Sequence, residues 1–433
     1  MVSDHYHDLS SALLWQYLKP DAENAEPVPV GGLINGRSIR DCADFPGRRC
    51  DTSTANVGLP SLDLEPGKNR RLRFINVGVL AEFQIQVDEH ELMISEVEGT
   101  YIVPRSFHRI TINPAQRYSV IINATRPEGD VFWLRARMVT ECFTDPPATF
   151  EPEVRAIVRY GAPGGRASVN EPISIDWTEP LEKECRDMNT TELVPVEQIS
   201  ISGKPDAFFY LRSNFEIGKY RLSRGHFNKT SFRPNARSPS LHRFVDGIAA
   251  KSASFMFPAV TEAAGQKAFV NDAAFDVSNE LVIQTTGIQT IDLIISNFDD
   301  GDHPFHAHGM WYFVLAQGHG YPPLTSVGAE ISSETLAPLY DSLDLSNPLR
   351  RDTATVEAFE RLLIRIVADN PGMWAFHCHV GWHSGAGLMM QLLTRSDELA
   401  IIEVPQAHRD LCAADRVERG MSPNNEDYKE LAR

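Results

Sequence analysis

Near its C-terminus the chain carries three histidines and one cysteine within seven residues, in the stretch His377–His383 (HCHVGWH). An apolar run and a turn at Asn370–Gly372 lead into this stretch, a context that favours a strand. Successive side chains of a strand point to opposite faces, so His377 and His379 face one way while Cys378 faces the other. The sequence therefore predicts one strand that supplies ligands to two metal sites.

A second histidine motif, Asp302–His308 (DHPFHAH), lies upstream. A blue-copper site needs one thiolate and two imidazoles in a roughly trigonal arrangement. Cys378 and His383 provide one of each, and His303, set apart from the other histidines of its motif by a proline, is the best source of the second imidazole. These three residues are the predicted ligands of a first copper site.

The other four histidines of the two motifs form two pairs, and each pair shares one strand face by alternation. We expect them to build a second cluster from His306, His308, His377 and His379. Zinc also takes cysteine and histidine, but zinc would not explain two HxH pairs beside a single cysteine. Copper is therefore the predicted metal.

Composition narrows the fold and the partners. The 433 residues exceed what one hydrophobic core usually supports, so two or three domains are expected. Proline and glycine, at 28 each, punctuate many short β-branched and aromatic runs, which is typical of mostly β sandwich or barrel modules. A net charge of −17 without a basic block argues against nucleic acid or an anionic membrane as partner. No apolar run approaches the ~18 residues of a membrane-spanning helix.

Local patterns place the expected elements. A short helix is expected at Ser10–Leu18, before Pro20. Partial period-two alternation and short apolar runs predict strands at Arg71–Val77, Glu82–Val87, Arg117–Ile122, Glu197–Ser202, Ala207–Arg212, Leu281–Thr285 and Ile291–Ser296. Long loops are expected in 216–280 and 318–353, and a surface helix or loop after Pro405. The Gly- and Pro-rich segment Gly161–Ala167 marks the expected domain boundary.

Several segments resemble one known family. His303–Gly309 (HPFHAHG) and Asn370–His383 (NPGMWAFHCHVGWH) resemble the two C-terminal copper motifs of the multicopper oxidases, most closely those of fungal laccases. Asn347–Thr353 (NPLRRDT) is similar to the segment that precedes the second motif. Three segments in the first half of the chain resemble parts of the family's second cupredoxin domain: Leu33–Gly36, Val87–His90 and Ala115–Ser119.

The resemblance covers nearly the whole chain and implies a mainly β fold of tandem cupredoxin-like Greek-key barrels or sandwiches. It implies a first cupredoxin domain without a copper motif at 1–162, a linker at 163–185, and a C-terminal cupredoxin domain at 186–433. The C-terminal domain would hold a type 1 copper site and half of a three-copper cluster.

Carried over residue by residue, the resemblance assigns each copper ligand. It implies a type 1 copper on His303, Cys378 and His383, a type 2 copper on His306, and a type 3 pair on His308, His377 and His379. The family's axial position falls on Leu388, which cannot coordinate. Loss of a weak axial thioether favours the reduced copper and raises its potential. Met389 and Met390 follow at once, and apolar packing is their expected role.

The resemblance also implies a reaction, the one-electron oxidation of phenolic or related substrates coupled to reduction of dioxygen to water. The substrate would give its electron at His383, and Cys378 would pass it through the backbone to His377 and His379. Asp88 aligns with a carboxylate that in laccases can accept the phenolic proton, which makes the phenol easier to oxidise. An exposed acidic turn is the alternative interpretation of Asp88.

Two other functions stay open. Asp299, Asp300 and Asp302 directly precede His303 and could hold Fe(II) near the first copper, as in a ferroxidase-type metal oxidase. The chain could instead be a non-enzymatic electron-transfer module with only the type 1 copper, or a remnant without copper.

Some features depart from the complete family pattern. Complete members bind the three-copper cluster with eight histidines, four of them from HxHG and HxH motifs of an N-terminal domain, and the resemblance does not extend to that domain. His5–His7 has the HxH form but resembles the opening strand of the second domain. Gly381 stands where many relatives carry an acidic residue, and Met310 where the family often has histidine. We therefore expect a truncated chain that cannot reduce dioxygen by itself.

The cysteines and the sequence termini bear on localisation. Five cysteines remain beside Cys378, an odd number, and in laccases a cysteine near the C-terminus commonly bonds to the first domain, so Cys412 is expected to lack its partner. Sequons at Asn123, Asn189 and Asn228, together with the resemblance, imply a secreted glycoprotein. The sequence opens without the charged and apolar regions of a signal peptide.

Overall fold

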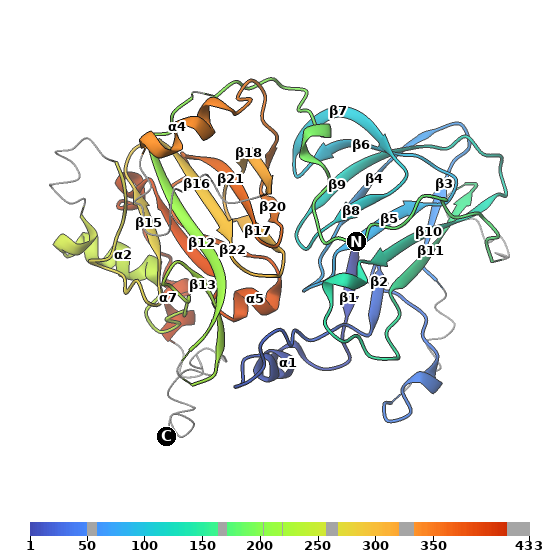
Figure 1. Cartoon of the computed structure of the whole chain (residues 1–433), viewed down its shortest axis with the longest axis horizontal. Coiled ribbons are helices and arrows are strands. Elements are labelled where there is room, and N and C mark those ends of the chain that lie inside the picture. Colours follow the sequence, from blue (N-terminus) through green and yellow to red (C-terminus); the bar gives the residue numbers. More distant parts are fainter. Residues whose placement is uncertain are drawn as a thin grey trace. The chain divides into compact units, whose positions relative to one another are not determined.

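A computed structural model describes residues 1–49, 59–162, 171–201, 203–218, 220–256, 267–319 and 333–413. The chain forms two compact units: unit 1 holds residues 1–9 and 26–197, and unit 2 holds residues 10–25 and 198–433. Strands dominate both units (Figure 1). The mainly β fold expected from the sequence is therefore confirmed.

Unit 1 is a set of short strands joined by turns. Its elements are β1 (Val2–His5), β2 (Gly31–Ile34), β3 (Ser61–Leu64), β4 (Asn69–Ile75), β5 (Phe83–Val87), β6 (Leu92–Val97), β7 (Thr100–Phe107), β8 (Ile110–Ile112), β9 (Arg117–Asn123), β10 (Val131–Met138) and β11 (Glu153–Tyr160), with 3-10 helices η1 (Cys42–Asp44), η3 (Thr140–Cys142) and η4 (Thr190–Glu192). They form a five-stranded sheet in the order β3-β11-β10-β5-β8, a four-stranded sheet in the order β4-β9-β6-β7, and the pair β1-β2.

Unit 1 extends past the boundary expected at 162. Residues 171–197 return along its sheets: the Asp176 carboxylate pairs with Arg137 of β10 at 2.6 Å, and Val103 of β7 donates to the Val194 carbonyl at 2.8 Å. The described part of the expected linker, 171–185, is thus packed against unit 1. The two units divide between Glu197 and Gln198.

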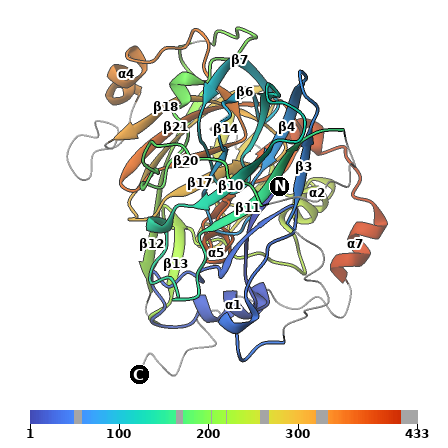
Figure 2. The same cartoon turned by 90° about the vertical axis from the view of Figure 1, so that its right-hand side faces the viewer.

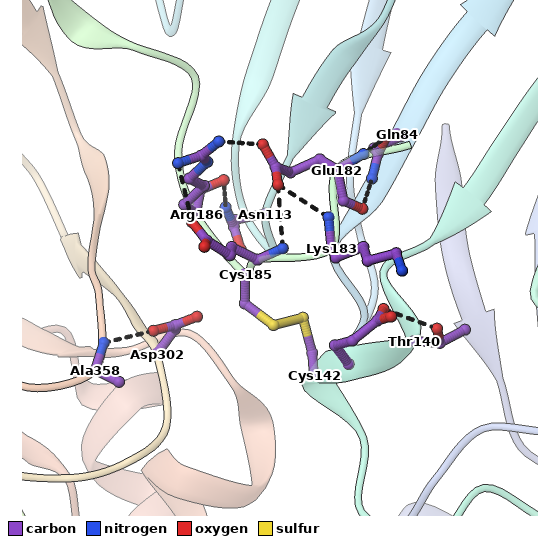
Figure 3. The surroundings of a disulfide bond; sticks show 12 residues. Gln84, Asn113, Thr140, Cys142, Glu182, Lys183, Cys185, Arg186, Asp302 and Ala358 are labelled. Carbon is purple, nitrogen blue, oxygen red and sulfur yellow. Dashed lines mark hydrogen bonds and ion pairs between the residues drawn. A yellow bond between two sulfur atoms is a disulfide. The ribbon is translucent and has the colours of Figure 1, made fainter. Parts of the chain in front are cut away.

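A disulfide between Cys142 of η3 and Cys185 fastens this returning segment (Figure 3). It links residues 43 positions apart, which stabilises the folded state by roughly 4 kcal/mol through loop closure in the unfolded chain. Nearby, the Glu182 backbone and the Gln84 side chain hydrogen-bond each other in both directions, at 2.6 and 3.0 Å. Cys42 is also disulfide-bonded, and the expectation for Cys412 concerns a side chain outside the described part.

Unit 2 carries both histidine motifs. Its helices are α1 (Ser10–Tyr17), α2 (Ser240–Ala249), α4 (Ser333–Asp341), α5 (Gly381–Gly385), α6 (Ser396–Leu399) and α7 (Gln406–Ala413), with the 3-10 helix η5 (Ala253–Phe255). Its strands are β12 (Ala207–Ile217), β13 (Ser223–Phe227), β14 (Ala268–Val270), β15 (Val282–Thr285), β16 (Gln289–Asn297), β17 (His303–Ala307), β18 (Tyr312–His319), β19 (Arg350–Arg351), β20 (Thr353–Val356), β21 (Glu360–Ala368), β22 (Gly372–Cys378) and β23 (Met389–Thr394).

These strands form two six-stranded sheets, β13-β12-β16-β21-β18-β19 and β14-β15-β23-β22-β17-β20. In the second sheet β17 pairs antiparallel with β22, which sets Phe305 opposite Cys378 and His306 opposite His377. The face that carries Phe305, Phe376 and Cys378 is buried, since apolar side chains alternate with histidines along both strands. One sheet thereby brings the two motifs together.

The local predictions met different outcomes. The helix at Ser10 and the strands from the first half, from Ala207, from Leu281 and from Ile291 are confirmed, with ends shifted by a few residues. The strand predicted at Glu197–Ser202 is wrong for its described residues 197–201, which are irregular. The region 216–280 contains β13, α2, η5 and β14, so it is not only loops. Its helix α2 carries a continuous apolar stripe at Leu241, Phe244, Val245 and Ile248, a helical signal that the sequence predictions did not use.

The described part of the chain contains no helix that is both long enough and apolar enough to cross a lipid bilayer.

Candidate metal centre

The two histidine motifs meet at the end of the β17–β22 ladder. His303 opens β17, Cys378 closes β22, and His383 follows on the short helix α5. The Cys378 N–H donates to the Leu388 carbonyl at 3.1 Å, and the Leu388 N–H donates to the His383 carbonyl at 3.0 Å. These bonds fold the loop after β22 back upon Cys378, which brings His383 to the thiol.

The first group of ligands is a compact triangle. His303 Nδ1 and His383 Nδ1 lie 3.1 Å apart, and Cys378 Sγ lies 3.7 Å from the former and 3.5 Å from the latter. A point equidistant from the three atoms is about 2 Å from each, close to metal–imidazole and metal–thiolate bond lengths. Among the described residues, His303, Cys378 and His383 form the group of three possible metal ligands whose ligand atoms all lie within 4.8 Å of one another. The donor set and its spacing fit a copper ion.

The triangle is closed to solvent. His303 and Cys378 are fully buried, and His383 is 6% exposed. Phe215 of β12 covers the two imidazoles, stacked on His303 with a centroid distance of 6.1 Å and edge-on to His383 at 5.1 Å. Water is therefore kept from the ligand atoms on this side.

Neighbouring groups shift the pKa of the Cys378 thiol. Burial raises the pKa of Cys378, but hydrogen bonds and charge from His303 and His383 outweigh burial and lower it to about 7. The thiolate is the form that binds a metal. The two imidazoles thus prepare the cysteine for a metal even before one binds.

Asp299 supports His303 from behind. Its Oδ2 lies 3.2 Å from His303 Nε2, close enough for an ion pair although the atoms are not aligned as a hydrogen bond. Burial alone would raise the pKa of Asp299, but the contacts with His303 and His383 lower it, so the carboxylate is ionised. A carboxylate at Nε2 leaves Nδ1, the atom of the triangle, free to bind a metal.

Leu388 occupies the position expected of an axial residue. β22 and β23 pair Phe376 with Met390 and His377 with Met389, so the same register sets Leu388 opposite Cys378. Leu388 is fully buried. Met389, one residue on, shares the face of His377 and points away from the thiol.

The second group consists of four imidazoles on the opposite face of the same two strands. Their ring centroids lie at the corners of a quadrilateral. Its sides are 5.0 Å for His306–His308, 5.1 Å for His308–His377, 5.5 Å for His377–His379 and 5.6 Å for His379–His306. The Nε2 atoms of His308 and His377 approach to 3.0 Å. The strand alternation predicted from the sequence therefore produces the expected separation into two groups.

Neighbouring groups fix how these rings point. His306 Nδ1 contacts the Asp352 carbonyl at 3.1 Å and the Thr353 hydroxyl at 2.9 Å, and His377 Nδ1 donates to the Cys378 carbonyl at 2.8 Å. Nε2 of both rings is thereby left as the ligand atom. Burial and, to a smaller extent, the adjacent imidazoles lower the pKa of His377 and of His379 to about 4, so both are neutral at pH 7.

A cleft of about 1110 Å³ in unit 2 reaches the second group at His308 and His377. Gly381 lines it as well. The position where many relatives carry a carboxylate thus faces open space beside the imidazoles.

Asp88, the expected proton acceptor, lies in a different environment from the one predicted. It is fully buried in unit 1, and its carboxylate accepts hydrogen bonds from Arg135 at 2.9 to 3.1 Å, from Ser174 at 2.8 Å and from Gln86 at 2.8 Å. These partners occupy both oxygens within unit 1. This enclosure favours a structural role for Asp88, and its expected role as acceptor of a phenolic proton stays a prediction.

The other expected residues are placed as follows. His5 and His7 pack edge-on in unit 1, with ring centroids 5.4 Å apart, and His7 also packs on Phe45. Asp302 accepts a hydrogen bond from the Ala358 N–H at 2.7 Å, so this acid caps a turn. Asp300 is exposed. Of the three acids before His303, Asp299 is the one described above in contact with His303, an expected metal ligand.

Sequence reasoning missed three supports of the centre: Phe215, Asp352 and Thr353. Asp352 and Thr353 lie in a segment that had been noted, but no spacing rule ties them to His306. Phe215 lies on a strand far upstream, where an aromatic residue carries no signal of a metal site.

Comparisons with known proteins agree with this geometry. Two family models described as multicopper oxidase match the chain, one at residues 1–163 and the other at 248–398. Laccase-2 of Cryptococcus neoformans var. grubii is 28% identical over 95% of this chain and 64% of its own length. The iron transport multicopper oxidase fio1 of Schizosaccharomyces pombe is 28% identical over 91% of this chain and 54% of its own length.

Solved structures show the same fold. A laccase from Botrytis aclada superposes with a TM-score of 0.73 at 25% identity, covering 95% of this chain and 66% of that one. Fet3p, a multicopper oxidase that functions in iron import, superposes with a TM-score of 0.71 at 20% identity, covering 99% and 72%. The chain spans about three fifths of the length of the curated relatives it matches.

Proposed function

Because this chain belongs to the multicopper oxidase family, we propose that it is a laccase-like copper oxidoreductase that takes single electrons from a phenolic or related substrate for dioxygen. The observation that carries the proposal is the buried triangle of His303, Cys378 and His383. Cys378 is flanked in the sequence by two of the four imidazoles of the second group. Relatives named laccase support the choice of substrate class.

The first group would hold the type 1 copper. His303, Cys378 and His383 would bind it through Nδ1, Sγ and Nδ1, and Leu388, which has no ligand atom, lies opposite Cys378. Asp299 keeps the His303 ring in the tautomer that offers Nδ1. Phe215 excludes water from the two rings, which lowers the reorganisation that a change of charge requires.

The second group would hold the type 2 and type 3 coppers, with His306 on the former and His308, His377 and His379 on the latter. Copper at the two groups would supply one-electron chemistry and oxygen chemistry respectively. The chain's own contribution is a covalent link, since His377 and His379 flank Cys378 directly. The link runs over about nine covalent bonds from Cys378 Sγ to Nε2 of either neighbouring ring, and Cys378 is fully buried.

A metal-oxidising function is the second candidate, and one contact favours it. The Asp299 carboxylate touches His303 directly, so a reduced metal ion held by Asp299 would lie beside a copper ligand. Relatives named for iron transport support this alternative. An electron-transfer module that carries only the type 1 copper is the third.

The proposal includes export and glycosylation. The acceptor residues of the three sequons, Asn123, Asn189 and Asn228, are all exposed in the structure. A mass shift on enzymatic removal of N-glycans from protein made in a fungal host tests this part, and an unchanged mass would contradict it.

The experiment that tests the function is anaerobic reduction of the copper-loaded chain. A phenol should bleach the thiolate-to-copper absorption faster than an equal concentration of Fe(II), and D299N should leave the phenol rate within a factor of a few. A faster reaction with Fe(II) that is lost in D299N would favour metal oxidation instead. Oxygen uptake measured on the same sample tests whether the four imidazoles of the second group suffice for turnover.

A further inference from the structure

The described part of the chain holds a third close pair of imidazoles, outside the centre above. His242 Nε2 and His408 Nδ1 lie 2.9 Å apart, with ring centroids at 5.1 Å and planes nearly perpendicular. The two nitrogen–nitrogen approaches inside the metal centre are 3.1 and 3.0 Å. The third pair therefore has nearly the same spacing as the two pairs inside the candidate metal centre.

The pair joins a core helix to a peripheral one. His242 lies on α2, whose Phe244 is fully buried in the core of unit 2, and His408 lies on α7. Figures 1 and 2 both show the two helices side by side. Most described side chains of α7 are exposed, Leu411 to 71%. Apolar packing therefore does not hold α7 in place.

One other contact ties the helices. Arg409 of α7 forms a two-pronged pair with Asp246 of α2, at 2.8 and 3.1 Å. An exposed ion pair and a single neutral hydrogen bond each contribute little to stability. Such contacts offset little of the entropy lost when a surface helix is fixed. A stronger bond between the helices would account for their docking.

We propose that His242 and His408 bind a borderline divalent transition-metal ion, zinc or copper, which fixes α7 on α2. Two imidazole nitrogens about 2.0 Å from one ion lie about 2.8 Å apart at the right angle of a square-planar copper site and about 3.3 Å apart at the tetrahedral angle of zinc. The observed separation of 2.9 Å falls within this range. Imidazole is a common ligand for both metals. The groups facing His242 are His408, Arg409 and Asp246, and water would complete the coordination.

The protonation state of His242 suits a ligand. Burial lowers its pKa, and the neighbouring His408 and Arg409 lower it further against the opposing effect of Asp246. The ring is therefore neutral at pH 7 and has a lone pair available. His408 is exposed, so a substitution there leaves the core intact.

Hydrogen exchange of the α7 amides in the full chain, with zinc chloride and then with excess chelator, tests the proposal. At a zinc concentration of tens of times the dissociation constant, exchange at residues 406–413 should slow by at least about tenfold, because binding stabilises the docked helix. The chelator should reverse the effect. H408Q should show no zinc effect. R409Q is the matched control: it removes the ion pair between the same helices and should keep the zinc effect.

Two outcomes would overturn the proposal. Exchange of the wild-type α7 amides that does not respond to zinc would mean that the imidazoles share only a hydrogen bond. Slowing by zinc that persists in H408Q would mean that the ion acts at another place. Zinc counted by elemental analysis should also fall by one ion per chain in H408Q and not in R409Q.

Discussion

The buried pair of Asp88 and Arg135 makes the sharpest prediction for stability. Asp88 is fully buried and Arg135 is 8% exposed, and three hydrogen bonds join them. The variant D88N removes the negative charge and leaves the Arg135 guanidinium with Glu153 at 3.1 Å as its remaining ion pair. Breaking a buried ion pair from one side costs about 3 to 5 kcal/mol. Unit 1 should lose stability of this order.

Hydrogen exchange in β10 measures the loss locally, because the strand carries Arg135 and because the Asp88 N–H donates to the Trp133 carbonyl at 2.9 Å. A cost of about 3 kcal/mol predicts exchange that is about a hundredfold faster for amides that open with unit 1. Asp63 provides the matched control: it pairs with Arg159 of β11 at 2.8 Å, but both side chains are about a fifth exposed. D63N should cost less than about 1 kcal/mol, or roughly fivefold in exchange.

Equal exchange in D88N and wild type would refute the structural role. If phenol oxidation then fell in D88N without any change in exchange, Asp88 would act as the proton acceptor after all.

Two further variants test the centre itself. L388M should lower the reduction potential of the bound copper, since a thioether in the axial position stabilises the oxidised metal; a spectroelectrochemical titration that finds an equal or higher potential would show that residue 388 does not face the copper. D299N should destabilise the metal-free chain most between about pH 4 and 6.5. Below this window acid protonates the Asp299 carboxylate, and the stability that goes with its lowered pKa is lost. Above the window the His303 ring loses its proton, and the stability that goes with its raised pKa is lost. Urea unfolding across pH measures the difference, and a difference that does not vary with pH would contradict the ion pair.

The sequence predicted how the histidines and Cys378 are grouped better than it predicted the rest of the chain, for a physical reason. Ligand spacing on a strand is set by alternation, so HxH and HCH fix which side chains share a face without any knowledge of tertiary contacts. The grouping of His306 with His377, opposite each other in the β17–β22 register, follows from the same rule.

Features that depend on distant segments were not predictable in this way. Phe215 covers the copper ligands from another sheet, and Asp299 reaches His303 through the geometry of a turn. The return of residues 171–197 along unit 1 depends on side-chain pairs such as Arg137 with Asp176, and composition suggested a linker there. The burial of Asp88 was not predictable for a related reason: it is set by strands that lie apart in the sequence.

The central claim is that His303, Cys378 and His383 hold a copper ion through a thiolate. The direct measurement is the visible absorption spectrum and copper content of the chain loaded with Cu(II), for wild type and C378S, with H226Q as a control at a histidine outside the centre. We predict an intense thiolate-to-copper band in wild type and in H226Q, and its complete loss in C378S while copper remains at the second group. A copper-loaded wild type without the band, or a C378S variant that keeps it, would contradict the account.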